Sequence, residues 1–194
     1  MTTLTIIVPT TGRSTLVGTL SSIAPQLEPG DEVIVACNND GNYGAASIDR
    51  CQEHARGDVV LFCDDDDVYL DGALSRIRAW ADANPGKIGL FRRRFNTGEK
   101  QWRSESLHPG NIQRMCIVMP NVSGKMPTWT GYVYEADIAR DAAARQDADI
   151  EFVDEVIGLA RPFEASRLRR LRYRLNLRTR ARSLLSASQV SRRL

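Results

Sequence analysis

The chain has 194 residues, of which 42% are hydrophobic and 26% are charged, and its formal net charge is +2. This length suits one folded domain with an appendage, and the composition excludes a wholly disordered or fibrous protein. No apolar run approaches the ~20 residues that a membrane-spanning helix needs. The N-terminus shows no secretory signal and the four cysteines show no metal-binding spacing, so we expect a cytoplasmic protein with reduced thiols.

Charge divides the chain into two parts. Residues 164–194 hold ten arginines and one acidic residue, whereas residues 1–163 have a net charge of −7. We therefore expect a domain at 1–163 and a basic tail at 164–194. In the tail, Leu168, Leu171 and Leu175 recur at helical spacing, which predicts an amphipathic helix. Such a helix can dock on the acidic domain, lie peripherally on the inner face of a membrane, or bind nucleic-acid phosphates.

The predicted elements of residues 1–163 alternate between strands and helices. Apolar, β-branched runs indicate buried strands, and helical periodicity ending at Gly, Asn or Pro indicates helices. In chain order we expect a strand at 4–8, a helix at 15–24, a strand at 32–37, a helix at 44–55, a strand at 59–63, a helix at 70–83, strands at 88–91 and 115–119, and helices at 133–144 and 152–159. This alternation predicts an α/β fold with a mostly parallel sheet flanked by helices.

Polar loops follow the first three predicted strands, and in a parallel sheet such loops gather at one edge and bind ligands. The third loop consists of four consecutive aspartates, Asp64 to Asp67. Four adjacent carboxylates repel one another unless a cation, a network of donors or bound protons compensates. Because divalent cations such as Mg²⁺ take oxygen ligands, the loop predicts a metal site. The alternative is an acidic loop whose last residue caps the next helix.

Three segments resemble family 2 glycosyltransferases of the GT-A fold: residues 5–13 (TIIVPTTGR), 42–46 (NYGAA) and 55–67 (ARGDVVLFCDDDD). Their order and spacing match as well, over residues 3–75. The resemblance implies a GT-A, Rossmann-like fold. It also implies transfer of a sugar from a nucleotide-diphosphate sugar to an acceptor, with Mn²⁺ or Mg²⁺ as cofactor and with inversion at the sugar.

The resemblance also implies roles for individual residues. The first loop contacts the nucleotide sugar, with Pro9 and Thr10 lining the base pocket and Thr11 and Arg13 beside them. Either Asn38 or Asp40 contacts the base, which the sequence leaves open because the usual aspartate pattern is changed there. In the acidic loop, Asp64 approaches the ribose, Asp65 also contacts the nucleotide sugar, and Asp66 coordinates the metal.

An inverting transfer needs a carboxylate that accepts the proton of the acceptor hydroxyl. The family takes this base from a Glu-Asp pair at the start of a helix in the second half, and Asp154-Glu155 is the nearest match, with the order reversed. We expect Glu155 to be the base and Asp154 to be the second candidate, ahead of Asp147, Asp149 and Glu151. The alternative is a solvated pair that only favours the start of a helix.

Two further groups of side chains have alternative interpretations. Trp129 is either an acceptor platform or part of the core. Residues 92–94, three arginines between Phe91 and Phe95, either reach a phosphate or cover a sheet edge.

The sequence does not identify the acceptor, which can be a glycan, a lipid-linked molecule or a modified nucleic acid. Two other classes of function remain as alternatives. One is a nucleotidyltransferase, and the other is a non-catalytic module that binds nucleic acid or a membrane through its basic tail.

Overall fold

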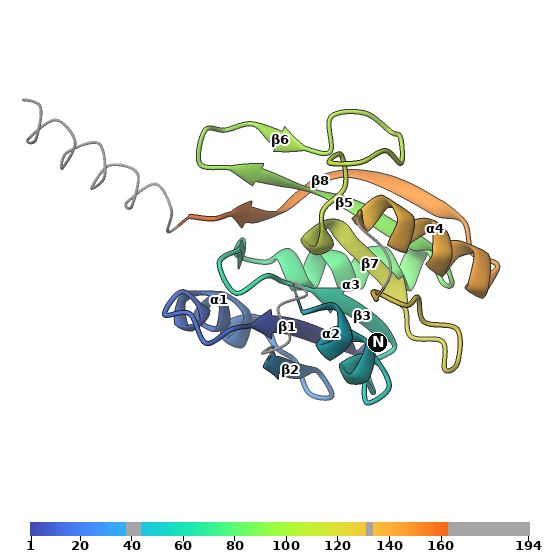
Figure 1. Cartoon of the computed structure of the whole chain (residues 1–194), viewed down its shortest axis with the longest axis horizontal. Helices are drawn as coiled ribbons and strands as arrows, with labels where there is room; N and C mark the ends of the chain where they lie inside the picture. Colours follow the sequence, from blue (N-terminus) through green and yellow to red (C-terminus); the bar gives the residue numbers. More distant parts are fainter. Residues whose placement is uncertain (38–43, 131–133, 163–194) are drawn as a thin grey trace, which may run out of the picture. The chain divides into compact units, whose positions relative to one another are not determined.

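The structure is a computed structural model, and it describes residues 1–37, 44–130 and 134–162 (Figure 1). The strands are β1 (Leu4–Thr10), β2 (Glu32–Cys37), β3 (Val59–Phe62), β4 (Val68–Tyr69), β5 (Ile88–Phe95), β6 (Lys100–Gln101), β7 (Ile117–Pro120) and β8 (Ile150–Ala160). The helices are α1 (Leu16–Ile23), α2 (Ala45–Gln52), α3 (Ala73–Ala83) and α4 (Glu135–Gln146), with 3-10 turns η1 (Ala24–Gln26) and η2 (Arg114–Cys116). The tail expected at 164–194 lies outside the described residues.

The strands form one curled sheet in the order β2-β1-β3-β7-β5-β8-β4, with β6 paired to β5. The longest ladders are parallel and join β1 to β2, β1 to β3, and β5 to β8. Strand β7 is antiparallel to both of its neighbours and connects the two parallel parts. The α/β fold class predicted from the sequence is therefore confirmed.

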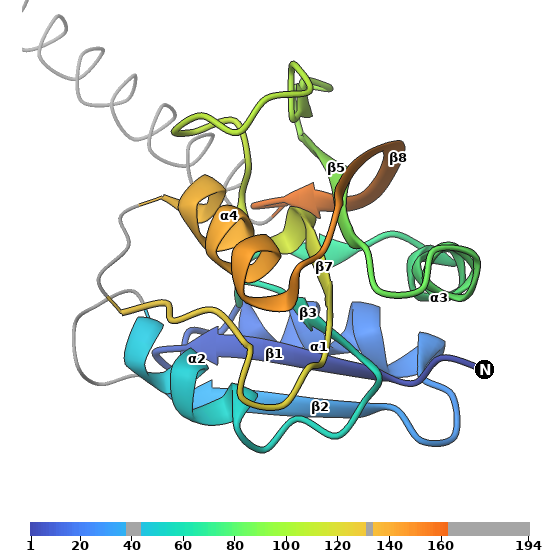
Figure 2. The ribbon, with the colours of Figure 1, turned by 90° about the vertical axis from the view of Figure 1, so that its right-hand side faces the viewer.

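Helices cover both faces of the sheet, and each face has its own apolar core (Figure 2). One core contains Ile48 of α2 and Ile138 of α4, and the other contains Ile23 of α1 and Ile77 of α3. Strand β1 supplies both cores because successive side chains point to opposite faces. All seven of its residues are buried, as its continuous apolar sequence predicts.

The helix expected at 152–159 is wrong, because these residues belong to the long strand β8. Strand β8 pairs in parallel with β5 from Ile88 and Ile150 to Phe95 and Ala160, with a bulge near Arg92. The segment is rich in β-branched residues, and pairing along β5 outweighs its local helical spacing. The short strands β4 and β6 were also not predicted.

Within the described parts of the chain, no helix is both long and apolar enough to cross a membrane.

Candidate functional site

The loops that follow β1 and β3 meet at the carboxyl edge of the sheet. The Thr10 hydroxyl donates a 2.6 Å hydrogen bond to Oδ2 of Asp65, although 55 residues separate them. Pro9 and Thr10 are buried at the end of β1, whereas Thr11 and Arg13 are exposed. The first and third predicted loops therefore lie together, as expected. Asn38 and Asp40, on the second loop, lie outside the described residues.

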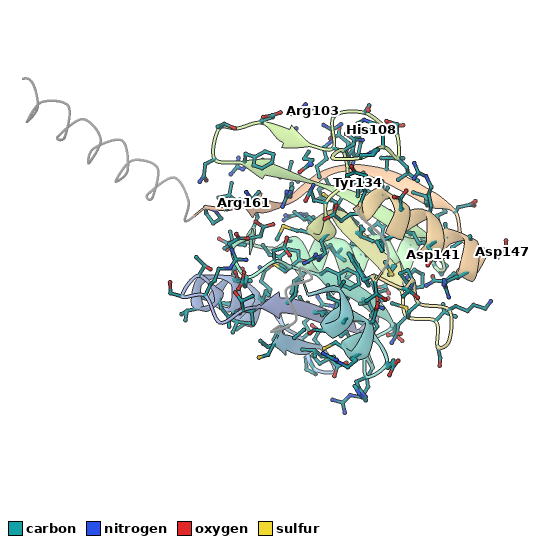
Figure 3. All side chains as sticks on the ribbon, viewed as in Figure 1. Arg103, His108, Tyr134, Asp141, Asp147 and Arg161 are labelled. Atoms are coloured by element: carbon teal, nitrogen blue, oxygen red, sulfur yellow. The ribbon has the colours of Figure 1, made fainter. Side chains whose placement is uncertain are left out.

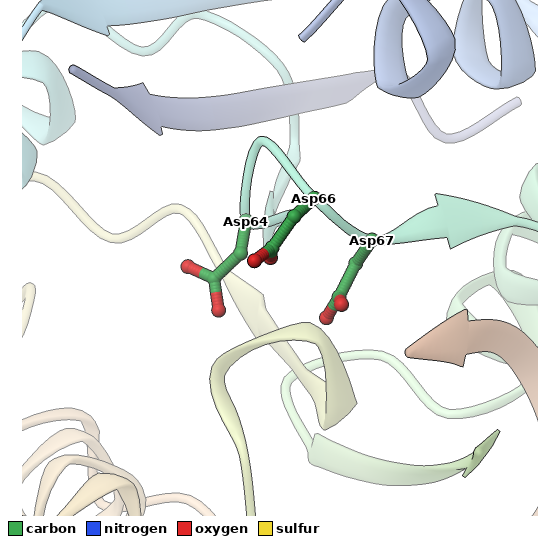
Figure 4. Close-up of side chains that lie close together, drawn as sticks. All are labelled: Asp64, Asp66 and Asp67. Atoms are coloured by element: carbon green, nitrogen blue, oxygen red, sulfur yellow. The ribbon is translucent and has the colours of Figure 1, made fainter. Parts of the chain in front are cut away.

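The acidic loop brings several carboxylates to one place. Oxygen atoms of Asp64, Asp66 and Asp67 lie within 4.8 Å of one another. Figure 4 shows these three side chains projecting from the same side of the loop. The fourth carboxylate, that of Asp65, is fully buried and faces the first loop instead.

Arginines from three separate parts of the chain neutralise the acidic loop. Arg114 of η2 lies 2.5 Å from Oδ1 of Asp64, and Arg93 of β5 lies 2.6 Å from Oδ2 of Asp67. Arg13 contacts two carboxylates, with 2.5 Å from Nη2 to Asp65 and 3.0 Å from Nη1 to Asp66. The repulsion expected among the four aspartates is thus offset by cations of the protein itself.

Asp67 anchors the loop to the sheet. Its side chain is buried, and both of its oxygens have partners: Arg93 binds Oδ2, and the main-chain N–H of Arg161 donates to Oδ1 at 2.9 Å. Arg161 directly follows β8, so this bond joins the acidic loop to the end of that strand (Figure 3). Burial raises the pKa of Asp67 to about 6, although Arg93 opposes the shift.

Asp64 and Asp66 are the residues best suited to hold a divalent cation. Each has one carboxylate oxygen in an ion pair with an arginine, and a carboxylate offers a second oxygen that can act as a metal ligand. Mg²⁺ is typically held by one or two carboxylates, with substrate phosphates completing its coordination. Burial raises the pKa of Asp66, with Arg13 opposing and Asp64 adding to the shift.

Trp129 lies in the core, where its ring packs against Arg114, the arginine that pairs with Asp64. Its ring is 4.7 Å from that of Phe62 on β3, and its Nε1 donates to Gln52. The guanidinium of Arg114 lies over the same ring, 5.3 Å from its centroid. Of the two interpretations of Trp129, the structure shows packing, and the buried ring positions the arginine that pairs with Asp64.

Asp49 fixes the segment that carries this tryptophan. Its carboxylate accepts hydrogen bonds from the main-chain N–H groups of Trp129 and Thr130 and from the Thr130 hydroxyl. The carboxylate of Asp49, on α2, thereby holds the main chain at Trp129 in place. Because Arg114 lies over the Trp129 ring, Asp49 also helps to position Arg114.

Glu135 is a half-buried acidic residue that the sequence interpretation did not single out. It is in the first turn of α4, and burial raises its pKa, with Arg114 opposing and Asp64 adding to that effect. Its carboxyl group therefore lies within electrostatic reach of the acidic loop. A signal was present in the sequence, because the expected helix at 133–144 places Glu135 in its first turn.

The predicted base pair, Asp154 and Glu155, lies on β8 and not at a helix start. Asp154 is exposed and pairs with Arg92 at 2.8 Å, and Glu155 pairs with Arg76 of α3. Arg161 lies six positions after Glu155, which corresponds to about 20 Å of extended chain. The structure therefore does not bring this pair to the acidic loop.

The three weaker candidates lie near the opposite end of β8. Asp147 ends α4 (Figure 3), and the Asp149 carbonyl accepts a hydrogen bond from the first residue of β5. Glu151 pairs with Lys87 at 2.9 Å, and the hydrogen bond from Lys87 lowers its pKa. These contacts give each of the three a place in the fold away from the acidic loop.

The arginines at 92–94 have separate environments. Arg92 lies over the Trp102 ring, 4.0 Å from its centroid, Arg93 is buried against Asp67, and Arg94 is exposed. The sequence did not predict that Arg93 holds the acidic loop.

Comparison with known families matches residues 37–140 to the profile described as glycosyl transferase family 2. This segment is more than half of the chain and includes the acidic loop, Arg93, Arg114 and Glu135. A comparison with curated proteins gives no match.

Comparison with solved structures identifies S. aureus TarS 1–349, with a TM-score of 0.61 and 16% identity over 81% of this chain and 60% of TarS 1–349. TarS 1–349 in complex with UDP-GlcNAc gives 0.58 and 15%, over 82% of this chain and 58% of that one. The mannosyltransferase PcManGT from Pyrobaculum calidifontis, in complex with GDP-Man and Mn²⁺, gives 0.57 and 17%, over 86% and 60%. The chain thus spans about three fifths of these proteins, and at these identities the likeness confirms the expected fold.

Proposed function

This chain belongs to glycosyl transferase family 2, and on that premise we propose that it transfers a sugar from a nucleoside-diphosphate donor to an acceptor hydroxyl. The observation that carries the proposal is the junction of the loops after β1 and β3, where Thr10 and Arg13 contact the acidic loop. In α/β sheets this edge is where ligands bind. A nucleotide held by the first loop would have its phosphates beside Asp64 and Asp66.

The proposed cofactor is Mn²⁺ or Mg²⁺, held by Asp64 and Asp66. A cation bound there would neutralise charge that develops on the departing nucleoside diphosphate. The carboxylate chemistry and the spacing of the oxygens support this assignment. Asp67 takes no part in it, because both of its oxygens hold other groups of the fold.

The donor is proposed to carry UDP or GDP. TarS has been solved with UDP-GlcNAc and PcManGT with GDP-Man, and both share the fold of this chain. We propose that Pro9, Thr10, Thr11 and either Asn38 or Asp40 contact the nucleoside.

Glu135 is proposed as the proton acceptor. In an inverting transfer the acceptor oxygen attacks the anomeric carbon, the bond to the diphosphate breaks, and a carboxylate takes the hydroxyl proton. A raised pKa makes Glu135 a better base than an ordinary carboxylate. Asp154 and Glu155, the pair predicted from the sequence, have the weaker claim because each is paired with an arginine away from the acidic loop.

The basic tail is proposed to bring the enzyme to an anionic acceptor or surface. Ten arginines within residues 164–194 favour phosphate groups as partners, and a lipid-linked acceptor on the inner face of a membrane fits such a role. A protein that lacks residues 164–194 is expected to lose binding to anionic vesicles and to retain nucleotide binding. Equal vesicle binding by the two proteins would contradict recruitment by the tail.

The experiment that tests the proposed function is a screen of UDP- and GDP-sugars with the purified chain and Mn²⁺, which measures release of the nucleoside diphosphate. One donor should be hydrolysed slowly without an acceptor, and Asp66→Asn should abolish the release. Asp71→Asn is the matched control, because Asp71 is an exposed aspartate beyond the acidic loop. Release by Asp66→Asn at the normal rate would contradict the proposal.

A further inference from the structure

Arg13 differs from the other two arginines that neutralise the acidic loop. Arg93 and Arg114 are largely buried, with side chains 6% and 12% exposed, whereas the Arg13 side chain is 52% exposed. Arg93 is also held by Gln101, and Arg114 lies over the Trp129 ring. Arg13 follows Gly12, which has φ +81° and no atom beyond its chain neighbours within 4 Å of the place that a β-carbon would take. Arg13 is therefore the arginine that can change partners at least cost to the fold.

The two carboxylates that Arg13 bridges also differ. Asp65 is fully buried and is held by the Thr10 hydroxyl, so it needs Arg13 as the partner of its charge. Asp66 is more accessible and is a proposed ligand of the divalent cation. The planar guanidinium places Nη2 on Asp65 and Nη1 on Asp66 at the same time. One half of the group thus has a fixed partner, and the other half has an exchangeable one.

From this asymmetry, and resting on the proposed function, we propose that Nη1 of Arg13 acts as an internal cation on Asp66 in the donor-free enzyme. When the donor and metal bind, Nη2 stays on Asp65 while Nη1 moves from Asp66 to a phosphate oxygen of the donor. No covalent bond changes in this exchange, and each anionic oxygen keeps a cation beside it. Arg13 thereby competes with the metal when the enzyme is free and binds the diphosphate when the donor is present.

The proposal predicts effects of opposite sign in one variant. Arg13→Gln removes the competing cation, so it should bind Mn²⁺ alone about two- to fivefold more tightly than the unmodified chain, as expected for loss of a weak ion pair. The same variant should bind UDP or GDP several-fold more weakly at saturating Mn²⁺, because a phosphate contact is lost. Arg13→Lys keeps the charge but cannot bridge two carboxylates in this planar geometry, so both effects should be intermediate.

The experiment uses the full chain and measures Mn²⁺ affinity by electron paramagnetic resonance of the free ion, and nucleotide affinity by isothermal titration calorimetry. The matched control is Arg56→Gln, because Arg56 is an exposed arginine that pairs with Glu32 at the other end of the domain. This control should change neither affinity. Melting temperatures of all variants confirm that they are folded.

Three results would count against the inference in different ways. Mn²⁺ binding by Arg13→Gln that is equal to or weaker than normal overturns the exchange and leaves the proposed function intact. Tighter Mn²⁺ binding with unchanged nucleotide binding overturns the transfer of Nη1 to the phosphate. No Mn²⁺ binding by any of the proteins, with or without UDP or GDP, overturns the metal site and this inference with it.

Discussion

Asp67 and Arg93 form an ion pair of 2.6 Å in which both side chains are almost wholly buried. The pair joins the acidic loop to β5, at the position where β5 pairs with β6 and β8. Removing one partner of a buried ion pair leaves the other charge buried and unpaired, which is strongly destabilising. Replacing both partners by apolar residues costs much less.

Replacing Asp67 with alanine is therefore expected to lower the free energy of unfolding by about 3–5 kcal/mol. Urea unfolding measures the loss. Asp154→Ala is the matched control, because Asp154 is exposed and its pair with Arg92 should contribute less than about 1 kcal/mol. Equal losses in the two variants would contradict the anchoring role of Asp67.

The raised pKa of Asp67 predicts a pH dependence of stability. Burial raises this pKa to about 6 in the folded chain, above the value of an unfolded aspartate. Between roughly pH 4 and pH 6 the folded state then binds more protons at Asp67 than the unfolded state does. The contribution of Asp67 to the free energy of unfolding therefore falls as the pH rises. Below that range this contribution is fully present, and above it the contribution is lost.

Comparison with Asp67→Asn isolates this effect from the other titrating groups. The stability of the unmodified chain relative to Asp67→Asn should decline between pH 4.5 and 6.5, by up to roughly 1 kcal/mol per pH unit. Urea unfolding of both proteins across this range measures the difference. A relative stability that increases with pH would mean that Arg93 lowers the pKa of Asp67 more than burial raises it.

Glu135→Gln is expected to lower kcat for donor hydrolysis by about 10²- to 10⁴-fold while nucleotide affinity changes little. The amide keeps the shape of the side chain but cannot accept the proton. Glu53→Gln, an exposed glutamate at the end of α2, is the matched control. If Glu155→Gln loses turnover and Glu135→Gln does not, the base lies on β8, and the assignment made from the sequence is the better one.

Gly158→Ala tests the packing of β8. A methyl group at this position would collide with Sδ of Met115 and lie 3.1 Å from the carbonyl oxygen of Val68. We expect the variant to lose about 1–3 kcal/mol of stability, as overpacked positions do. In a Met115→Ala background the same change should cost much less, and thermal or urea unfolding of the four proteins gives the coupling. Equal costs in both backgrounds would contradict this contact.

Local sequence was sufficient to predict the first half of the fold. Strands β2 and β3 are short apolar runs that end just before Asn38 and Asp64, so their ends are marked in the chain itself, whereas β1 continues through Pro9 to Thr10. The loops after β1 and β3 could be placed together because parallel strands direct their carboxyl ends to one edge. The contact between Thr10 and Asp65 confirms that step.

The second half depends on pairing that local sequence does not reveal. Residues of β8 have a spacing compatible with a helix, and only the open edge of β5 determines that they form a strand. The base assignment to Asp154 and Glu155 assumed a helix there, and the premise was wrong. Arg93 and Arg114 reach the acidic loop from elements far along the chain. The sequence therefore revealed the four carboxylates but not the arginines that pair with them.

The ladder between β5 and β8 has a consequence for how the protein is made. Contacts between residues so distant in sequence form late, and they slow folding. A nascent chain that ends before residue 150 has all of the proposed metal ligands but leaves one edge of β5 open, which invites pairing with another molecule. C-terminal shortening of this protein should therefore stop after Arg161, since earlier end points produce chains prone to aggregate.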